Sequence, residues 1–209
     1  MLKIRTHSAL AILFAASLAG PAVAQTTVPE DQQLGRAIAD LSSTACYGIA
    51  TGTIVFPSDH GPDSLEQTIS LVGKMGLGFG INDRMLKALG PLGQTLVTRA
   101  TMGSKALDHG DVVVTFGGPQ QGCRVLLLAD TPVNVTKIVG VGLAKAGWKA
   151  VPTLTTQRGM AERRVFLKRD AQGSPYLMNL WTIGDATSKL RFITTTVRIP
   201  AGVSLPAGF

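Results

Sequence analysis

The first third of the chain carries apolar residues at helical spacing. One helix is predicted within residues 30–46, because four apolar positions fall on one of its faces and its acidic start suits the positive end of a helix dipole. Cys46 closes this segment, where a helix can be joined to a sheet. The four apolar positions are Leu34, Ile38, Leu41 and Ala45.

Two further helices and a strand are predicted before residue 91. Ser64 fits a capping box, and it opens a helix whose apolar stripe is Leu65, Ile69 and Val72. A short third helix is expected from an Asn82 cap to the terminating pair Gly90-Pro91. Residues 51–56 suggest a short strand that Pro57 ends.

The pattern then changes to the alternation and β-branched runs that are typical of strands. The run at 123–130 is apolar enough for a central strand. A fourth helix is predicted over 132–146, with Thr131 as its cap, Pro132 at its first position and Gly147 as its end. Gly140 and Gly142 weaken that helix, so we expect its backbone to approach the sheet closely. The other predicted strands are 94–102, 111–116, 148–154, 163–168, 175–183 and 190–199.

This order of elements predicts the fold class. Helices come first, and a run of strands with a single helix among them follows, which favours an α+β fold. We expect a mainly antiparallel sheet of about five to seven strands with one helix packed across it. No internal repeat or composition break divides the chain, so residues 25–209 are expected to form a single domain.

Residues 1–24 have the features of a secretory signal peptide. Lys3 and Arg5 precede the apolar run 9–18, and small residues stand at 22–24 before the expected cleavage site. The apolar run is shorter than the ~20 residues that span a bilayer, although a retained membrane anchor is the alternative. We therefore expect an exported protein, in the periplasm or outside the cell, that is not integral to a membrane. Nucleic acid is not an expected partner in that location.

The two cysteines, Cys46 and Cys123, are expected to form one disulfide in an oxidising compartment. Such a bridge stabilises by roughly 4 kcal/mol on the chain-entropy model. A catalytic thiol is the alternative. Two cysteines and two mature histidines without a close pair lack the ligand spacing of a zinc site, and we expect no cofactor.

Positive charge is the clearest indication of a partner. Removal of Lys3 and Arg5 lowers the net charge from +7 to +5, and basic residues crowd the segment 145–169. On a strand, Arg164, Phe166 and Lys168 share one face, which we expect to be exposed to solvent, while Val165 and Leu167 belong to a core stripe on the other. The residues proposed to contact an anionic envelope component or an acidic protein are Arg163, Arg164, Lys168 and Arg169. A simple solvated sheet face is the alternative.

The triplet Asp-His-Gly occurs twice, at 59–61 and at 108–110. If the two copies converged, His60 and His109 with Asp59 and Asp108 would suit a divalent metal with an open position for water. The alternative is two turns that precede new structural elements. The chain has no Gly-x-Ser-x-Gly elbow, and the glycine-rich run 72–80 lacks the strand-to-helix context of a phosphate loop.

Two functions of different classes follow. The first is a non-catalytic binding or structural module of the cell envelope. The second is a small exported hydrolase, with or without a metal, in which His60 and His109 act as metal ligands or as general bases.

Overall fold

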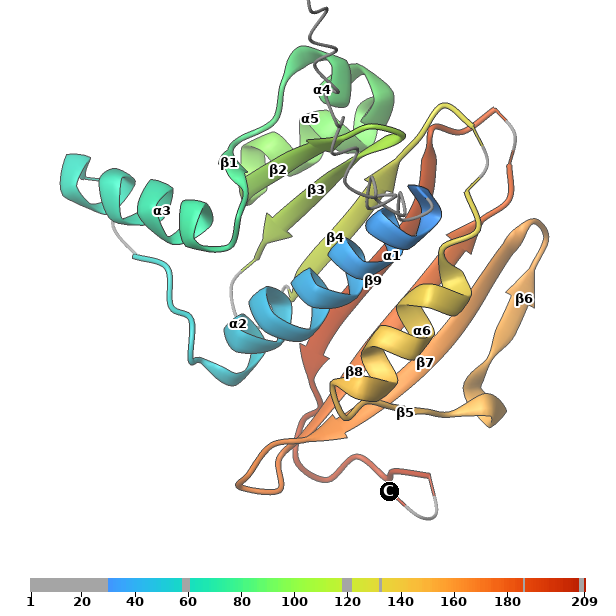
Figure 1. The fold of residues 1–209 in the computed structure, drawn as a ribbon. Helices are drawn as coiled ribbons and strands as arrows, with labels where there is room; N and C mark the ends of the chain where they lie inside the picture. The colour runs from blue at the N-terminus through green and yellow to red at the C-terminus, as the bar shows by residue number, and fades with distance from the viewer. Residues whose placement is uncertain (1–29, 58–60, 118–121, 132, 186, 207–208) are drawn as a thin grey trace, which may run out of the picture.

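The computed structural model describes residues 30–57, 61–117, 122–131, 133–185, 187–206 and 209. The expected signal peptide lies outside these residues. At the centre is a nine-stranded sheet in the order β1-β2-β3-β4-β9-β8-β7-β5, with β6 also paired to β7 and every pair antiparallel (Figure 1). The α+β prediction is confirmed, but short strands raise the count above seven. The strands are β1 (Gly78–Phe79), β2 (Thr101–Leu107), β3 (Gly110–Phe116), β4 (Cys123–Leu128), β5 (Lys149–Ala150), β6 (Thr156–Arg158), β7 (Ala161–Arg169), β8 (Pro175–Ile183) and β9 (Leu190–Arg198).

One face of the sheet, here called the helix face, is covered by the predicted first and fourth helices (Figure 1). A Cβ atom added to Gly142 would lie 2.5 Å from the Ala39 Cβ, whereas one added to Gly140 meets nothing within 4 Å. The close approach that the glycines predicted is therefore real at Gly142, but it is made to the neighbouring helix and not to the sheet. The elements on this face are α1 (Glu30–Leu41), the π-helical segment η1 (Ser42–Cys46), α2 (Tyr47–Thr51) and α6 (Thr136–Lys145).

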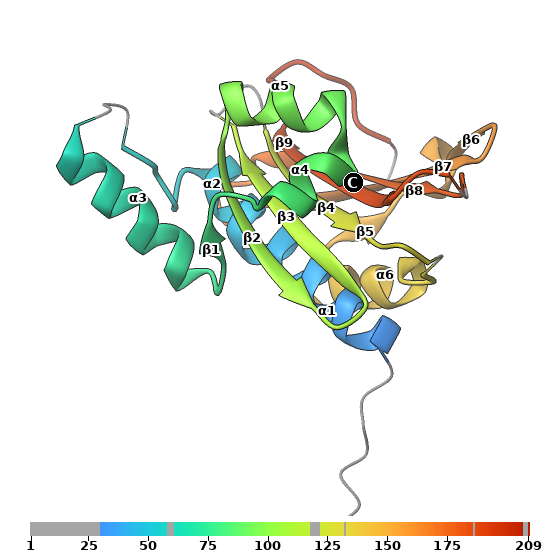
Figure 2. The same cartoon turned by 90° about the horizontal axis from the view of Figure 1, so that it is seen from above.

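The opposite face, here called the open face, carries two short helices at one end, α4 (Asp83–Leu89) and α5 (Pro91–Arg99) (Figure 2). The Asn82 side chain accepts a hydrogen bond of 2.9 Å from the backbone N–H of Met85, which confirms the predicted cap. A small apolar cluster fixes both helices on β2–β4. The C-terminal segment packs against Leu167 and Leu177 of the same face. Between the α4–α5 helices and the C-terminal segment, the open face is partly exposed to solvent.

Helix α3 (Pro62–Lys74) extends beside β1, away from the sheet (Figures 1 and 2). Its N-cap is Gly61, with Pro62 in the first turn, so Ser64 lies inside the helix and is buried rather than capping it. Within the predicted apolar stripe Val72 is buried, but Leu65 and Ile69 are 51% and 45% exposed. The stripe reaches the core only at the end of the helix nearest the sheet.

Three other local predictions are wrong. Residues 51–56 form no strand, because α2 continues to Thr51 and Gly52 ends it with a φ of +77°. Residues 94–99 are helical, because Pro91 starts a new helix after the turn at Gly90, and strand β2 begins only at Thr101. Of the strand predicted over 148–154, only β5 forms, and the 3₁₀ turn η2 (Pro152–Leu154) follows it.

Helix α6 is shorter than predicted. It begins at Thr136 and ends at Lys145, and its N-cap is Val135 without a capping side chain. The preceding backbone is held elsewhere, since the N–H of Asn134 donates to the Asp31 carboxylate at 3.3 Å. Pro132, the expected first residue, lies outside the described residues.

The disulfide Cys46–Cys123 is present, as predicted, and joins the end of η1 to the start of β4. Its two sulfur-bearing residues are 0% and 1% exposed, and their Cα atoms are 5.0 Å apart. The bridge therefore fixes the helix layer to a central strand. Among the residues that the structure describes, none of the helices has the length and apolar character needed to cross a bilayer.

Candidate functional site

A small polar pocket lies at one end of the sheet, where the β2–β3 turn, the end of β4 and the segment before β9 meet α4. Its volume is about 250 Å³. The charged and titratable residues that line it are Arg84, Asp108, His109, Asp111, Asp130 and Lys189. Because these residues come from four separate parts of the chain, their charges depend on the tertiary fold.

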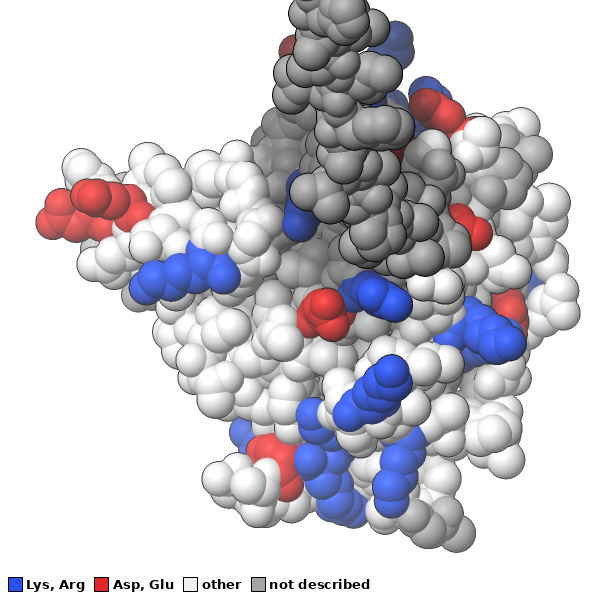
Figure 3. Space-filling model, in the orientation of Figure 1, with Lys and Arg blue, Asp and Glu red and all other residues white. Residues whose placement is uncertain are grey.

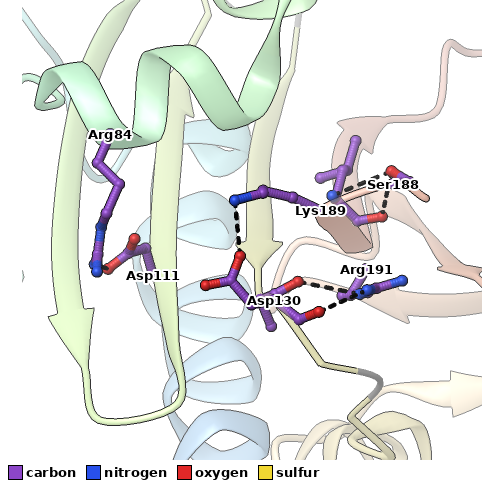
Figure 4. Close-up of polar contacts among 8 residues, drawn as sticks. Arg84, Asp111, Asp130, Ser188, Lys189 and Arg191 are labelled. Carbon is purple, nitrogen blue, oxygen red and sulfur yellow. Dashed lines mark hydrogen bonds and ion pairs between the residues drawn. The ribbon is translucent and has the colours of Figure 1, made fainter. Parts of the chain in front are cut away.

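Most of the pocket's charges are already paired with one another (Figure 4). Arg84 from α4 forms an ion pair of 2.5 Å with Asp111 of β3, whose side chain is only 8% exposed. Lys189 and Asp130 form a second, exposed pair at 2.8 Å. The hydrogen bond from Lys189 and its positive charge lower the pKa of Asp130. These two pairs neutralise four of the lining charges, and the exposed Asp108 carboxylate belongs to neither pair.

Arg191 lies beside Asp130, next to this pocket (Figure 4). It is 5% exposed, and its guanidinium donates to the backbone carbonyls of Asp185 at 2.7 Å, Ala129 at 3.2 Å and Asp130 at 3.2 Å. The β4–β9 register shifts between Leu127 and Leu128, next to this residue's strand position. Arg191 thus satisfies three backbone carbonyls beside this register shift, which is a structural role.

The second Asp-His-Gly triplet is a hairpin turn. Asp108 and His109 connect β2 to β3, and Leu107 pairs with Gly110 across the turn, as the turn interpretation predicted. Asp59 and His60 of the first triplet lie outside the described residues, so a shared metal site stays a prediction. Within the described residues, no three histidine, cysteine or acidic side chains lie close enough to hold a metal ion.

The four basic residues proposed to contact an anionic partner are divided between the two faces of β7. On the open face, the Arg163 Nε donates to Asn179 Oδ1 at 2.8 Å, and its guanidinium carbon lies 5.9 Å from the Trp181 ring centre. Arg169 donates to the carbonyls of Gly173 at 2.7 Å and Phe209 at 3.3 Å, so it fixes the chain terminus. Because the four side chains lie on two opposite faces of β7, they form no single surface.

On the helix face, Arg164 pairs with Glu162 at 2.7 Å. Lys168 Nζ donates to the Ala146 carbonyl at 2.7 Å and lies 4.3 Å from the centre of the Tyr47 ring. Burial there lowers the pKa of Lys168. Phe166, between the two, is only 5% exposed. The expectation that this side of β7 faces solvent is wrong for Phe166 and Lys168, which lie under the helix layer, whereas the Arg164 side chain is 42% exposed.

Positive charge on the helix face comes instead from exposed lysines. Figure 3 shows cationic side chains over the region of α6 and β5, where Lys137, Lys145 and Lys149 are exposed. This distribution is typical of a solvated helix surface, and it lies over no described pocket.

The open face carries a larger depression, here called the open-face groove. It has a volume of about 640 Å³, a wall formed by α5 and a floor formed by β4, β9 and β8. The lining residues are mostly apolar, and Arg124 is the one charged residue among them. The lining comprises Leu92, Thr95, Leu96, Ala100, Gly117, Arg124, Leu126, Trp181, Ile193 and Thr195.

Sheet register explains how these residues meet. Arg124 of β4 lies opposite Thr195 of β9, which lies opposite Asn179 of β8, and Ile193 lies opposite Trp181. Arg124 is half-buried, and no hydrogen bond or ion pair joins its guanidinium to another of the described residues. Sequence reasoning missed Arg124. Its signal was a single charged residue inside the otherwise apolar strand 123–128.

No protein family, curated protein or solved structure matches the chain.

Proposed function

We propose that the protein is an exported, non-catalytic binding module that holds an anionic ligand or partner in the open-face groove. The observation that carries this proposal is the Arg124 guanidinium, which lines the groove without a described acceptor. A half-buried cation of this kind loses hydration without gaining a partner among the residues that the structure describes, so an anion in the groove would complete its hydrogen bonds. Arg163, on the same face, adds to the positive potential.

Other features support a binding role over a catalytic one. In the polar pocket, four charged side chains already pair with one another, so they are less available to act on a substrate: Arg84 with Asp111 and Lys189 with Asp130. The groove has one charged residue and two threonine hydroxyls in its lining, without a carboxylate or an imidazole to serve as a general base there.

Export is supported by two separate features. The first 24 residues have the organisation of a signal peptide, and the buried disulfide suits an oxidising compartment. The full chain with a C-terminal tag should be fractionated from a Gram-negative host and its N-terminus sequenced. We expect a periplasmic product that begins at Gln25 with both cysteines oxidised. A cytosolic product that retains Met1 would contradict the export part of the proposal.

Binding is tested on the exported protein by native mass spectrometry, which detects species that co-purify. Wild type is compared with Arg124→Glu and with Lys137→Glu, a charge reversal at an exposed position on the helix face. We expect an anionic species on wild type and Lys137→Glu that is absent from Arg124→Glu. Two outcomes would count against the groove as the binding surface: wild type without a bound anionic species, or the same species bound to wild type and to both variants.

A further inference from the structure

We infer that the open-face groove takes a small amphiphilic monoanion, a molecule with an apolar body and a single carboxylate or sulfonate group. This inference rests on the proposed function and specifies its ligand. The groove's volume of about 640 Å³ falls within the range of small-molecule pockets and far exceeds the need of an inorganic anion.

The apolar side chains of the groove lining would contact the apolar body of such a ligand. Leu92 and Leu96 of α5 stand on one side, and Leu126, Ile193 and Trp181 belong to the floor. Leu92 is 40% exposed and Trp181 is half-buried, so part of this apolar surface is in contact with water. Its removal from water would supply the main driving force for binding, at ~25 cal/mol per Å² of area buried.

Arg124 specifies the charged part. A guanidinium presents a planar fork of N–H donors that matches the two oxygens of a carboxylate or sulfonate. Thr195, directly across the β4–β9 ladder and also in the lining, adds a hydroxyl that can donate to the same group. Arg124 is the single charged residue in a lining whose other polar side chains are the two threonines Thr95 and Thr195, so the groove suits one anionic group.

The rest of the open face limits the ligand to a single charge and a small size. Arg163 is already bound to Asn179, and Arg169 to Gly173 and the chain terminus. The C-terminal segment packs on Leu167 and Leu177, so the floor of the open-face groove does not extend beyond β8. An extended acidic peptide would need a longer track with several free cations, so the observations favour the small monoanion.

The test uses two fluorescent probes that differ in one group. Anilinonaphthalene sulfonate carries the anion, and N-phenyl-1-naphthylamine is its neutral analogue. Each is titrated into oxidised wild type, Arg124→Gln and Arg36→Gln, which removes the same charge from an exposed position on α1. We expect Arg124→Gln to weaken the sulfonate probe about tenfold or more, while the neutral probe and Arg36→Gln show less than a twofold change.

Competition then identifies the ligand class. Dodecanoate should displace the sulfonate probe from wild type, and dodecanol at the same concentration should not. Equal loss of both probes in Arg124→Gln, equal loss in Arg36→Gln, or displacement by oligoglutamate but not by dodecanoate would overturn the inference. Circular dichroism of each variant confirms that it is folded. The probe experiments can fail while the anionic species seen by native mass spectrometry still depends on Arg124. In that case the proposed function stands and only the ligand class is wrong.

Discussion

The hydroxyl oxygens of Ser42 and Thr194 lie 2.8 Å apart between the helix layer and the sheet, where both residues are 0% exposed. Ser42→Ala leaves the Thr194 hydroxyl without this partner and should lower the free energy of unfolding by about 1–3 kcal/mol. The double variant Ser42→Ala/Thr194→Val removes both hydroxyls and should cost less than the sum of the single changes. Urea denaturation of wild type, Ser42→Ala, Thr194→Val and the double variant measures this coupling, and additive costs would show that the contact contributes nothing.

Gly140 and Gly142 provide a matched pair on α6. Gly142→Ala places a Cβ 2.5 Å from that of Ala39, so the two helices must separate, at a cost of about 1–3 kcal/mol. Gly140→Ala meets no atom within 4 Å and should stabilise by up to ~1 kcal/mol through helix propensity. Thermal unfolding should shift in opposite directions. A common shift would mean that α1 and α6 are not in close contact.

The disulfide should be inert in the native protein and should stabilise it strongly. Its partners are 77 residues apart, so Cys46→Ala/Cys123→Ala should lower the free energy of unfolding by about 4 kcal/mol. A thiol reagent should label neither cysteine before or after unfolding without reductant. Reductant should destabilise wild type by a similar amount and leave the double variant unchanged. Labelling of the native protein would contradict the bridge.

Ionisation of Asp170 should make the free energy of unfolding fall as the pH becomes acidic. Desolvation opposes its ionisation, but hydrogen bonds from Ser174 N, Tyr176 OH and Gln172 N lower its pKa below the ordinary 3.8. A lowered folded-state pKa adds stability above 3.8 that is lost as the pH falls through the folded value.

Asp170→Asn should therefore be less stable than wild type at about pH 6, and the two should converge near about pH 2. Asp40→Asn, at an exposed position on α1, is the control. Melting temperatures across this range measure the effect. A constant difference between wild type and Asp170→Asn at every pH would assign the loss to packing rather than to ionisation.

The sequence predicted elements whose signals are local. The Asn82 cap, the strand 111–116 and the apolar run after Cys123 all formed where the pattern placed them. Predictions failed where two local signals competed. Pro91 was interpreted as the end of one helix but also starts the next, and Ser64 lost its capping position to Gly61 and Pro62.

The groove was less predictable, because its residues meet only through long-range strand pairing. Arg124, Thr195 and Trp181 belong to β4, β9 and β8, and no local pattern in the sequence reveals the order of those strands. Arg163 was identified from its local charge. Its separation from Arg164 and Lys168 follows from strand alternation, but which face would lie under helices depended on the tertiary fold.

Cys123 and Arg124 are consecutive residues of β4, and their side chains leave that strand in opposite directions. The covalent anchor of the helix layer and the charged residue of the open-face groove are thus only one peptide bond apart. A shift of the first residues of β4 would therefore move both the disulfide and the Arg124 guanidinium. Formation of the disulfide during folding thus also positions the guanidinium.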